Sequence, residues 1–205
     1  MSMAHSFKTV RHKSEALYKE KGSKFLALAF PVNNENEVIQ IIKSVKKEHY
    51  NARHHCYAYI IGNGDPRFRS NDDGEPRHTA GDPILNQIRS FKLNNVLVVV
   101  VRYFGGTKLG KAGLINAYKT ASKEALIKAR IIEKVHRSEI AINFKYDGIN
   151  DVMNFIQKNN FEILTQKYEE SCYITGLIPK SQVQEIINDL TGYKNVINVV
   201  QLPGR

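Results

Sequence analysis

Runs of apolar and alternating residues in the first half of the chain predict four strands. They lie at residues 7–12, 23–32, 56–61 and 96–103. The last run contains the consecutive valines Val98 to Val101. A strand without polar alternation is usually covered on both faces. We therefore expect residues 96–103 at the centre of their sheet.

Helical periodicity predicts three helices between and after these strands. Asn34 and Glu37 have the spacing of a capping pair ahead of an amphipathic segment. A short helix is expected at 83 to about 91, and a long one from about 109 to 134. On the long helix an apolar stripe opposes a basic stripe. The basic stripe consists of Lys119, Lys123, Arg130 and Lys134.

The segment between residues 62 and 83 is polar. Gly62 to Pro66 reads as a turn, and the run at 67–83 is so rich in Gly, Pro and Asp that we expect no regular element in it. Loops of this length inside compact domains are usually functional or disordered.

The pattern restarts after residue 137. Strand, helix, strand, strand, helix and strand follow one another, which is the order of a ferredoxin-like domain. The sequence thus predicts an α+β protein of two domains, residues 1–137 and 138–205.

The two predicted domains also differ in net charge. The net charge of +10 arises from 24 Lys and Arg against 12 Asp and Glu in residues 1–137, and from 6 against 8 in residues 138–205. The first domain is therefore the part expected to meet a polyanion. Surface lysines that serve only solubility are the simpler alternative.

Neither a membrane span of ~18 apolar residues nor a hydrophobic signal core occurs, so we expect a cytoplasmic protein without membrane contact. Cys56 and Cys172 are expected to be free thiols.

A glycine-rich turn follows the valine strand. Gly105 to Lys111 spells G-x-x-x-x-G-K, which is close to a phosphate-binding P-loop. The next residue, Ala112, has no hydroxyl for Mg²⁺, so we expect no nucleotide cofactor and no other cofactor.

Metal-ligand residue types gather around the third strand and the polar run. They are His54, His55, Cys56, Asp72, Asp73, Glu75 and His78. Strand alternation turns His54 and Cys56 away from His55, and no zinc-like cysteine spacing exists. We expect no metal and name no catalytic residue. The acidic residues are expected to hydrogen-bond to loop backbone or to pair with Arg67, Arg69, Arg77 or Arg102, with contact to a partner or a metal as the alternative.

Three segments carry a family resemblance: RHHCYAY at 53–59, NDDGEPRHTAGDPIL at 71–85 and VVVRYFGGTKLGKAGL at 99–114. They are similar to the signature segments of the IMPACT family, whose bacterial members are called YigZ-like. The resemblance implies an N-terminal domain with the fold of the second domain of ribosomal small-subunit protein five. It also implies a ferredoxin-like C-terminal domain similar to the last domain of elongation factor G.

Function is implied only coarsely by this resemblance. Eukaryotic members regulate translation by binding the scaffold protein that activates the initiation-factor kinase of the amino-acid starvation response. The chain departs from the family where it has His78 instead of the usual Gly, and where Lys111 and Ala112 replace the usual small residues.

The leading hypothesis is a non-catalytic regulator or binding protein of translation that contacts RNA or a ribosome-associated partner through the basic domain. The residues expected to bind nucleic acid or another anion are Arg53, Arg102, Gly105, Gly106, Lys108, Lys111, Lys119, Lys123 and Arg130. One alternative is an enzyme with a pocket formed by the 71–83 loop, the His54 strand and the Gly105–Gly106 turn. In that pocket a loop site would comprise His54, Asp72, Asp73, Glu75 and His78. The other alternative is a protein-interaction module without nucleic-acid binding.

Overall fold

The computed structural model describes residues 6–62, 66–169 and 171–203. The chain divides into two compact units, Phe7–Lys134 and Val135–Arg205, and Ser6 is grouped with the latter. They are termed the first unit and the second unit. Residues 63–65 of the predicted turn at 62–66 lie outside the described residues.

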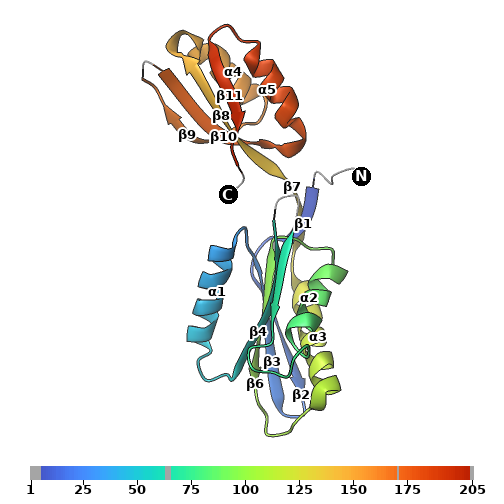
Figure 1. Cartoon of the computed structure of the whole chain (residues 1–205). Helices are drawn as coiled ribbons and strands as arrows, with labels where there is room; N and C mark the ends of the chain where they lie inside the picture. The colour runs from blue at the N-terminus through green and yellow to red at the C-terminus, as the bar shows by residue number, and fades with distance from the viewer. Residues whose placement is uncertain (1–5, 63–65, 170, 204–205) are drawn as a thin grey trace. The chain divides into compact units, whose positions relative to one another are not determined.

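The first unit is built on a five-stranded antiparallel sheet with helices on both faces (Figure 1). In spatial order the strands are β2 (Ser14–Glu20), β3 (Ser23–Pro31), β6 (Val96–Tyr103), β4 (His54–Ile61) and β5 (Arg67–Asn71). Helix α1 (Glu35–Glu48) covers one face, and α2 (Gly81–Ser90) and α3 (Gly110–Lys128) cover the other. The central position predicted for residues 96–103 is confirmed.

The valines of β6 alternate between two hydrophobic cores. Val98 and Val100 belong to the core beneath α2 and α3, whereas Val99 and Val101 belong to the core beneath α1. All four are completely buried. The unbroken apolar run exists because each successive side chain meets a different helical layer.

The predicted capping pair starts α1. The Asn34 side chain accepts a hydrogen bond from the Glu37 amide at 2.9 Å, and the Glu37 carboxylate accepts one from the Asn33 amide at 2.9 Å. Two amides that the helix leaves without partners are thereby satisfied, which fixes where α1 begins.

The expectation of an irregular run at 67–83 is wrong at both ends. Residues 67–71 form β5, which pairs with β4, and α2 already begins at Gly81. A strand gains its ladder hydrogen bonds from the main chain, so a polar composition does not prevent pairing with a free sheet edge. The irregular loop is therefore shorter than predicted and covers 72–80.

The long helix predicted at 109–134 is also wrong in extent. Helix α3 ends at Lys128, and Ala129 is extended with φ −69° and ψ 137°. Residues Ile131–Val135 form β7, which joins β1 (Ser6–Val10) in a two-stranded sheet. β-branched side chains favour strands where a partner strand is available. Strand β2 is a further element that the pattern did not reveal.

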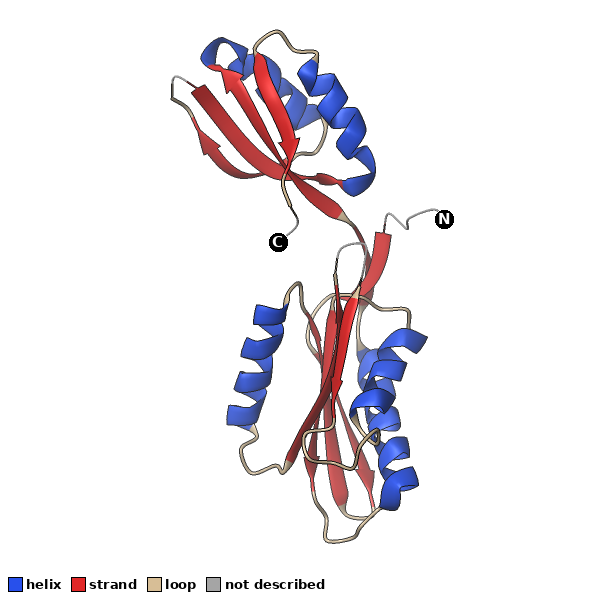
Figure 2. Cartoon of the chain, in the orientation of Figure 1, coloured by secondary structure: helices blue, strands red, loops and turns tan. Residues whose placement is uncertain are grey.

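The second unit contains the predicted ferredoxin-like arrangement. Its elements are β8 (Arg137–Lys145), α4 (Ile149–Lys158), β9 (Glu162–Lys167), β10 (Ser171–Pro179), α5 (Val183–Thr191) and β11 (Val196–Gln201). The antiparallel sheet has the order β11-β8-β10-β9, and both helices pack on one face of it (Figure 2). This confirms an α+β protein whose C-terminal part is ferredoxin-like.

Candidate functional site

At the end of the five-stranded sheet Arg102 lies between two neighbouring strands. In the antiparallel register Arg102 of β6 lies opposite Phe25 of β3 on one side and His54 of β4 on the other. Directly opposed residues point to the same face of a sheet. Since Phe25 belongs to the core beneath α2 and α3, all three side chains face that helical layer.

The glycine turn after β6 is shaped by backbone requirements. A Cβ on Gly105 would lie 1.9 Å from the carbonyl carbon of Gly22, so no larger residue fits where the two turns meet. Gly106 has φ +89° and Gly110 has φ +70°, a region that favours glycine. The backbone of the strand-to-helix turn therefore explains the glycines at these positions. Phosphate binding is not needed to account for the spacing that resembles a P-loop.

The first turn of α3 lacks both a side-chain cap and an acidic residue. Its amides accordingly have no side-chain acceptor within the helix, and an exposed helix N-terminus favours anions.

Asp72 and Asp73 hold the 72–80 loop in place. The Asp72 carboxylate accepts hydrogen bonds from the amides of His78, Ala80 and Gly81 at 2.8–3.0 Å. The Asp73 carboxylate accepts from the His55 amide at 2.8 Å and pairs with Lys46 at 2.8 Å. Burial by itself would raise the pKa of Asp73, but these two hydrogen bonds lower it below its ordinary value. The expected hydrogen bonds between these acids and backbone amides are therefore present.

The rigid loop directs Glu75 inward to a buried ion pair. Arg102 donates from Nη1 to Glu75 Oε1 at 2.7 Å, and the two side chains are only 6% and 4% exposed. The Tyr118 hydroxyl donates to the same oxygen at 2.8 Å. The single hydrogen of the Cys56 thiol can be donated to the Tyr118 hydroxyl, 3.3 Å from Sγ, or to the Asp72 carbonyl, 2.9 Å from Sγ. Arg102 and Glu75 thus anchor one hydrogen-bonded network.

Burial keeps two members of this network, Cys56 and Tyr118, protonated. It raises the pKa of Cys56 and the pKa of Tyr118 far above their ordinary values, so both groups stay protonated. A buried, protonated thiol is unreactive as a nucleophile. The Arg102 guanidinium lies between two rings, 5.4 Å from the centre of Phe25 and 5.5 Å from that of Phe104. Cys56 and Tyr118 therefore orient Glu75 and Arg102 and do not themselves supply an attacking group.

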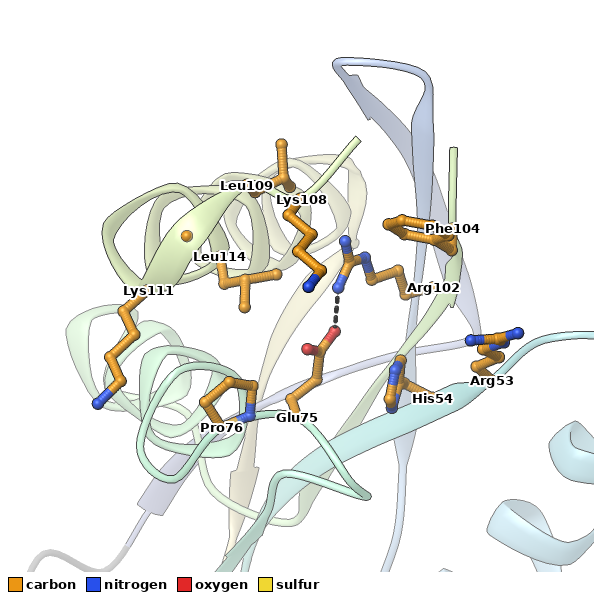
Figure 3. A pocket seen from close by; sticks show the side chains of 11 residues that line it. Arg53, His54, Glu75, Pro76, Arg102, Phe104, Lys108, Leu109, Lys111 and Leu114 are labelled. Carbon is orange, nitrogen blue, oxygen red and sulfur yellow. Dashed lines mark hydrogen bonds and ion pairs between the residues drawn. The ribbon is translucent and has the colours of Figure 1, made fainter. Parts of the chain in front are cut away.

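A cleft of about 420 Å³ opens over this ion pair. Its lining comprises Arg53, His54, Glu75, Pro76, Arg102, Phe104, Lys108, Leu109, Gly110, Lys111 and Leu114. Figure 3 shows Glu75 and Arg102 at the centre, with Lys108 and Lys111 reaching out from the side of α3 and Arg53 on the opposite side. Apolar walls beside a cationic rim are typical of a site for an anionic ligand with an apolar part.

The structure brings together six of the residues named from the sequence. Arg53, His54, Glu75, Arg102, Lys108 and Lys111 all line the cleft. Asp72 and Asp73 brace its loop, and Gly105 and Gly106 form the adjoining turn. The pocket expected between the 71–83 loop and the His54 strand thus coincides with this cleft.

The other predicted residues lie elsewhere. His78 and Lys119 line a second hollow of about 320 Å³ between α2 and α3, and Lys123 is exposed on α3. The placement of Arg130 on the α3 stripe was wrong, because the helix ends before it and its carbonyl accepts a hydrogen bond from the Arg11 amide.

His78 has a left-handed backbone with φ +65°, which accounts for the glycine that the family resemblance leads one to expect at this position. Its Nδ1 lies 2.6 Å from Asp82 Oδ2.

Phe104 and Tyr118 are two site residues that the sequence did not reveal. Phe104 is 45% exposed at the cleft, whereas Tyr118 was assigned to the apolar helix face alone. The position of Phe104 in the sequence, between Arg102 and Gly105, could have identified it as a site residue. The hydroxyl contact of Tyr118 depends on tertiary packing.

Among the described residues, no group of three or more His, Cys, Asp or Glu side chains is placed to hold a metal ion. Within the same residues, no helix combines the length and apolar character that crossing a membrane requires.

Comparison with known proteins gives one consistent family. The family model of the Impact N-terminal domain matches residues 21–126. IMPACT family member YvyE of Bacillus subtilis is 32% identical over 98% of this chain and 94% of its own length. IMPACT family member YigZ of Escherichia coli is 29% identical over 84% of this chain and 86% of its own length.

More distant matches agree. The protein IMPACT homolog of Saccharomyces cerevisiae is 32% identical over 54% of this chain and 43% of its own length. A crystal structure described as that of a hypothetical protein has a TM-score of 0.78 at 24% identity, covering 98% of this chain and 99% of that one. This last likeness extends to the fold of nearly the whole chain.

Proposed function

Because the chain belongs to the IMPACT family, we propose that it is a non-catalytic, translation-associated protein that binds RNA through the basic surface of its first unit. The association with translation rests on the family resemblance, because eukaryotic members of the family regulate translation. The RNA ligand rests on the charge of this chain. We expect no cofactor to be needed for binding.

The observation that carries the proposal is a set of exposed cations without carboxylate partners. They are Arg53, Lys108, Lys111, Lys119 and Lys123. Among the described residues none of them forms an ion pair, whereas Lys46 and Arg102 do. Cations engaged in salt bridges contribute less to binding a polyanion, so the unpaired set offers its full charge to phosphates.

The distribution of these cations supports RNA over a small anion. Arg53, Lys108 and Lys111 surround the cleft, while Lys119 and Lys123 continue along α3, which begins at the cleft. A ligand with phosphates at intervals would engage both groups, whereas a small anion would engage only the first. Residues 1–137 also carry the net charge of +12 derived from their 24 basic and 12 acidic side chains.

Fluorescence anisotropy with a labelled RNA hairpin at several KCl concentrations tests this proposal. Replacement of both lysines on α3, Lys119→Glu with Lys123→Glu, is expected to weaken binding and to lower the salt slope by about one per lost phosphate contact. The matched control carries Lys145→Glu and Lys167→Glu, which make the same charge change on exposed residues of the second unit. Affinity that does not fall with salt, or an equal loss in both variants, would refute binding by this surface.

A further inference from the structure

One oxygen of the Glu75 carboxylate has no hydrogen-bond partner among the described residues. Both hydrogen bonds to this side chain, from Arg102 and from Tyr118, end on Oε1. Within the described part of the chain no group donates to Oε2. The side chain is 4% exposed, and Figure 3 shows the second oxygen turned away from Arg102 toward the side of the cleft where Pro76 and Leu114 lie.

The second oxygen is open to the cleft, because among the described residues the buried side-chain atoms without a hydrogen-bond partner include Arg102 Nε but not Glu75 Oε2. A carboxylate is an acceptor only, so this oxygen can accept a hydrogen bond from a ligand that enters the cleft. The network on Oε1 fixes the direction of Oε2, since Arg102 and Tyr118 hold the carboxylate from the other side. The cleft therefore presents a fixed acceptor to whatever enters it.

The surroundings of this oxygen define the shape and polarity of the ligand. Pro76, Leu109 and Leu114 supply apolar walls, and Lys108 and Lys111 supply charge on the α3 side. A flat apolar group with a donor at its edge, attached to an anion, fits this combination. The volume of about 420 Å³ lies within the range of roughly 300–1,000 Å³ that is usual for small-ligand pockets. That volume suits one nucleotide and excludes a duplex.

We propose that the cleft binds one unpaired nucleotide of the RNA, whose base donates from an exocyclic amino group to Glu75 Oε2 while Lys108 and Lys111 hold its phosphate. This inference rests on the proposed function and names the part of the RNA that the site reads. The base must be unpaired because pairing in a duplex occupies its Watson–Crick edge. Single-stranded loops and ends are therefore the ligand class.

The same geometry predicts which bases are preferred. Cytosine, adenine and guanine carry an exocyclic amino group. Uracil instead presents carbonyl oxygens on both sides of its N3–H, and the carboxylate oxygen repels them. Cytosine and uracil form the sharpest comparison, because they differ at ring position four by an amino group against a carbonyl.

Glu75→Gln reverses this preference without changing the size of the side chain. The amide oxygen must take the Oε1 position, since Arg102 and Tyr118 both donate there. The amide NH₂ group then faces the cleft as a donor in place of Oε2. A carbonyl of uracil becomes the better partner, and the amino group of cytosine meets another donor.

The experiment measures binding of single-stranded cytidine and uridine octamers, which have equal length and charge, to the full chain. The wild type is expected to bind the cytidine octamer about ten-fold more tightly, the effect of one hydrogen bond to a charged acceptor. Glu75→Gln is expected to bind the uridine octamer at least as tightly as the cytidine octamer. A purely structural role of Glu75 would weaken both octamers equally.

A second pair of variants covers the case in which Glu75→Gln fails to fold. Lys111→Gln at the cleft is expected to weaken both octamers, whereas Lys128→Gln, also exposed on α3 but at its far end, is not. Equal binding of the two octamers by the wild type overturns the inference, as does an equal effect of the two lysine variants. If the hairpin still binds with salt dependence in those cases, the proposed function stands. If neither hairpin nor octamers bind, both proposals fall.

Discussion

Replacement of Glu75 by leucine is expected to destabilise the first unit severely. Leucine has a similar volume but is apolar. The substitution therefore removes the only carboxylate that pairs with Arg102 among the described residues. The guanidinium remains 6% exposed, and even with Glu75 present no described residue accepts a hydrogen bond from its Nε. The remaining polar contact of its other nitrogens is the Ser23 hydroxyl at 3.5 Å, which is at the limit for a hydrogen bond.

The magnitude follows from what is left buried. Removal of one partner of a buried ion pair costs about 3–5 kcal/mol, because the other charge stays desolvated without compensation. The Tyr118 hydroxyl also loses its acceptor, while its contact with Cys56 at 3.3 Å persists. Addition of Arg102→Met to Glu75→Leu should recover most of the loss, since buried ion pairs are often replaced by apolar residues at little cost.

The assay is hydrogen exchange of β6 peptides at increasing urea in the full chain, which reports the first unit separately from the second. We expect Glu75→Leu to lower the free energy of opening by about 4 kcal/mol, and the double variant to lie within about 1–2 kcal/mol of wild type. A loss below about 1 kcal/mol for Glu75→Leu, or strictly additive effects of the two substitutions, would refute the view that an uncompensated guanidinium dominates.

Three further outcomes are expected. Gly105→Ala should lower the urea midpoint of the first unit more than Gly106→Ala, because a Cβ at 105 meets backbone at 1.9 Å whereas one at 106 meets nothing within 4 Å and only its φ of +89° costs about 1–2 kcal/mol. Burial lowers the pKa of His55 below 6.5, so the unfolded state takes up this proton more readily and the first unit should lose stability as the pH falls from about 7 to about 5. His55→Gln should flatten that pH profile of β4 exchange. Lys123→Glu should weaken hairpin binding more than Arg130→Glu, since Arg130 lies beyond the end of α3; equal losses would indicate that total charge and not the helix face sets the affinity.

Short-range patterns predicted most of the architecture. The valine run placed β6 at the centre because burial on both faces leaves no polar alternation. The Asn34 and Glu37 pair marked the start of α1 because capping is a local interaction. The ferredoxin-like unit could be predicted because each of its helices has one clear apolar face. Val152, Phe155 and Ile156 form this face on α4.

The wrong predictions for β5, β7 and the end of α3 share one cause, which is strand pairing between distant parts of the chain. Strands β5 and β7 form because a partner edge is present in space, and Arg67–Asn71 is too polar to signal it. The helix prediction ran past Lys128 because Ile132 happens to continue the apolar stripe that Leu114 begins. Periodicity cannot distinguish that coincidence from a real turn of helix when a strand pairing competes.

The sequence predicted several residues of the candidate site but not which of them pair with one another. The sequence left Arg67, Arg69, Arg77 and Arg102 as possible partners of the loop acids. Only the register that places Arg102 opposite His54 explains why Glu75 pairs with Arg102. Tyr118 then donates from α3 to the same carboxylate oxygen as Arg102, and no other described residue donates to the second oxygen. The antiparallel register and the packing of α3 therefore determine which oxygen faces the cleft, and this oxygen is the group through which we propose that the cleft selects its ligand.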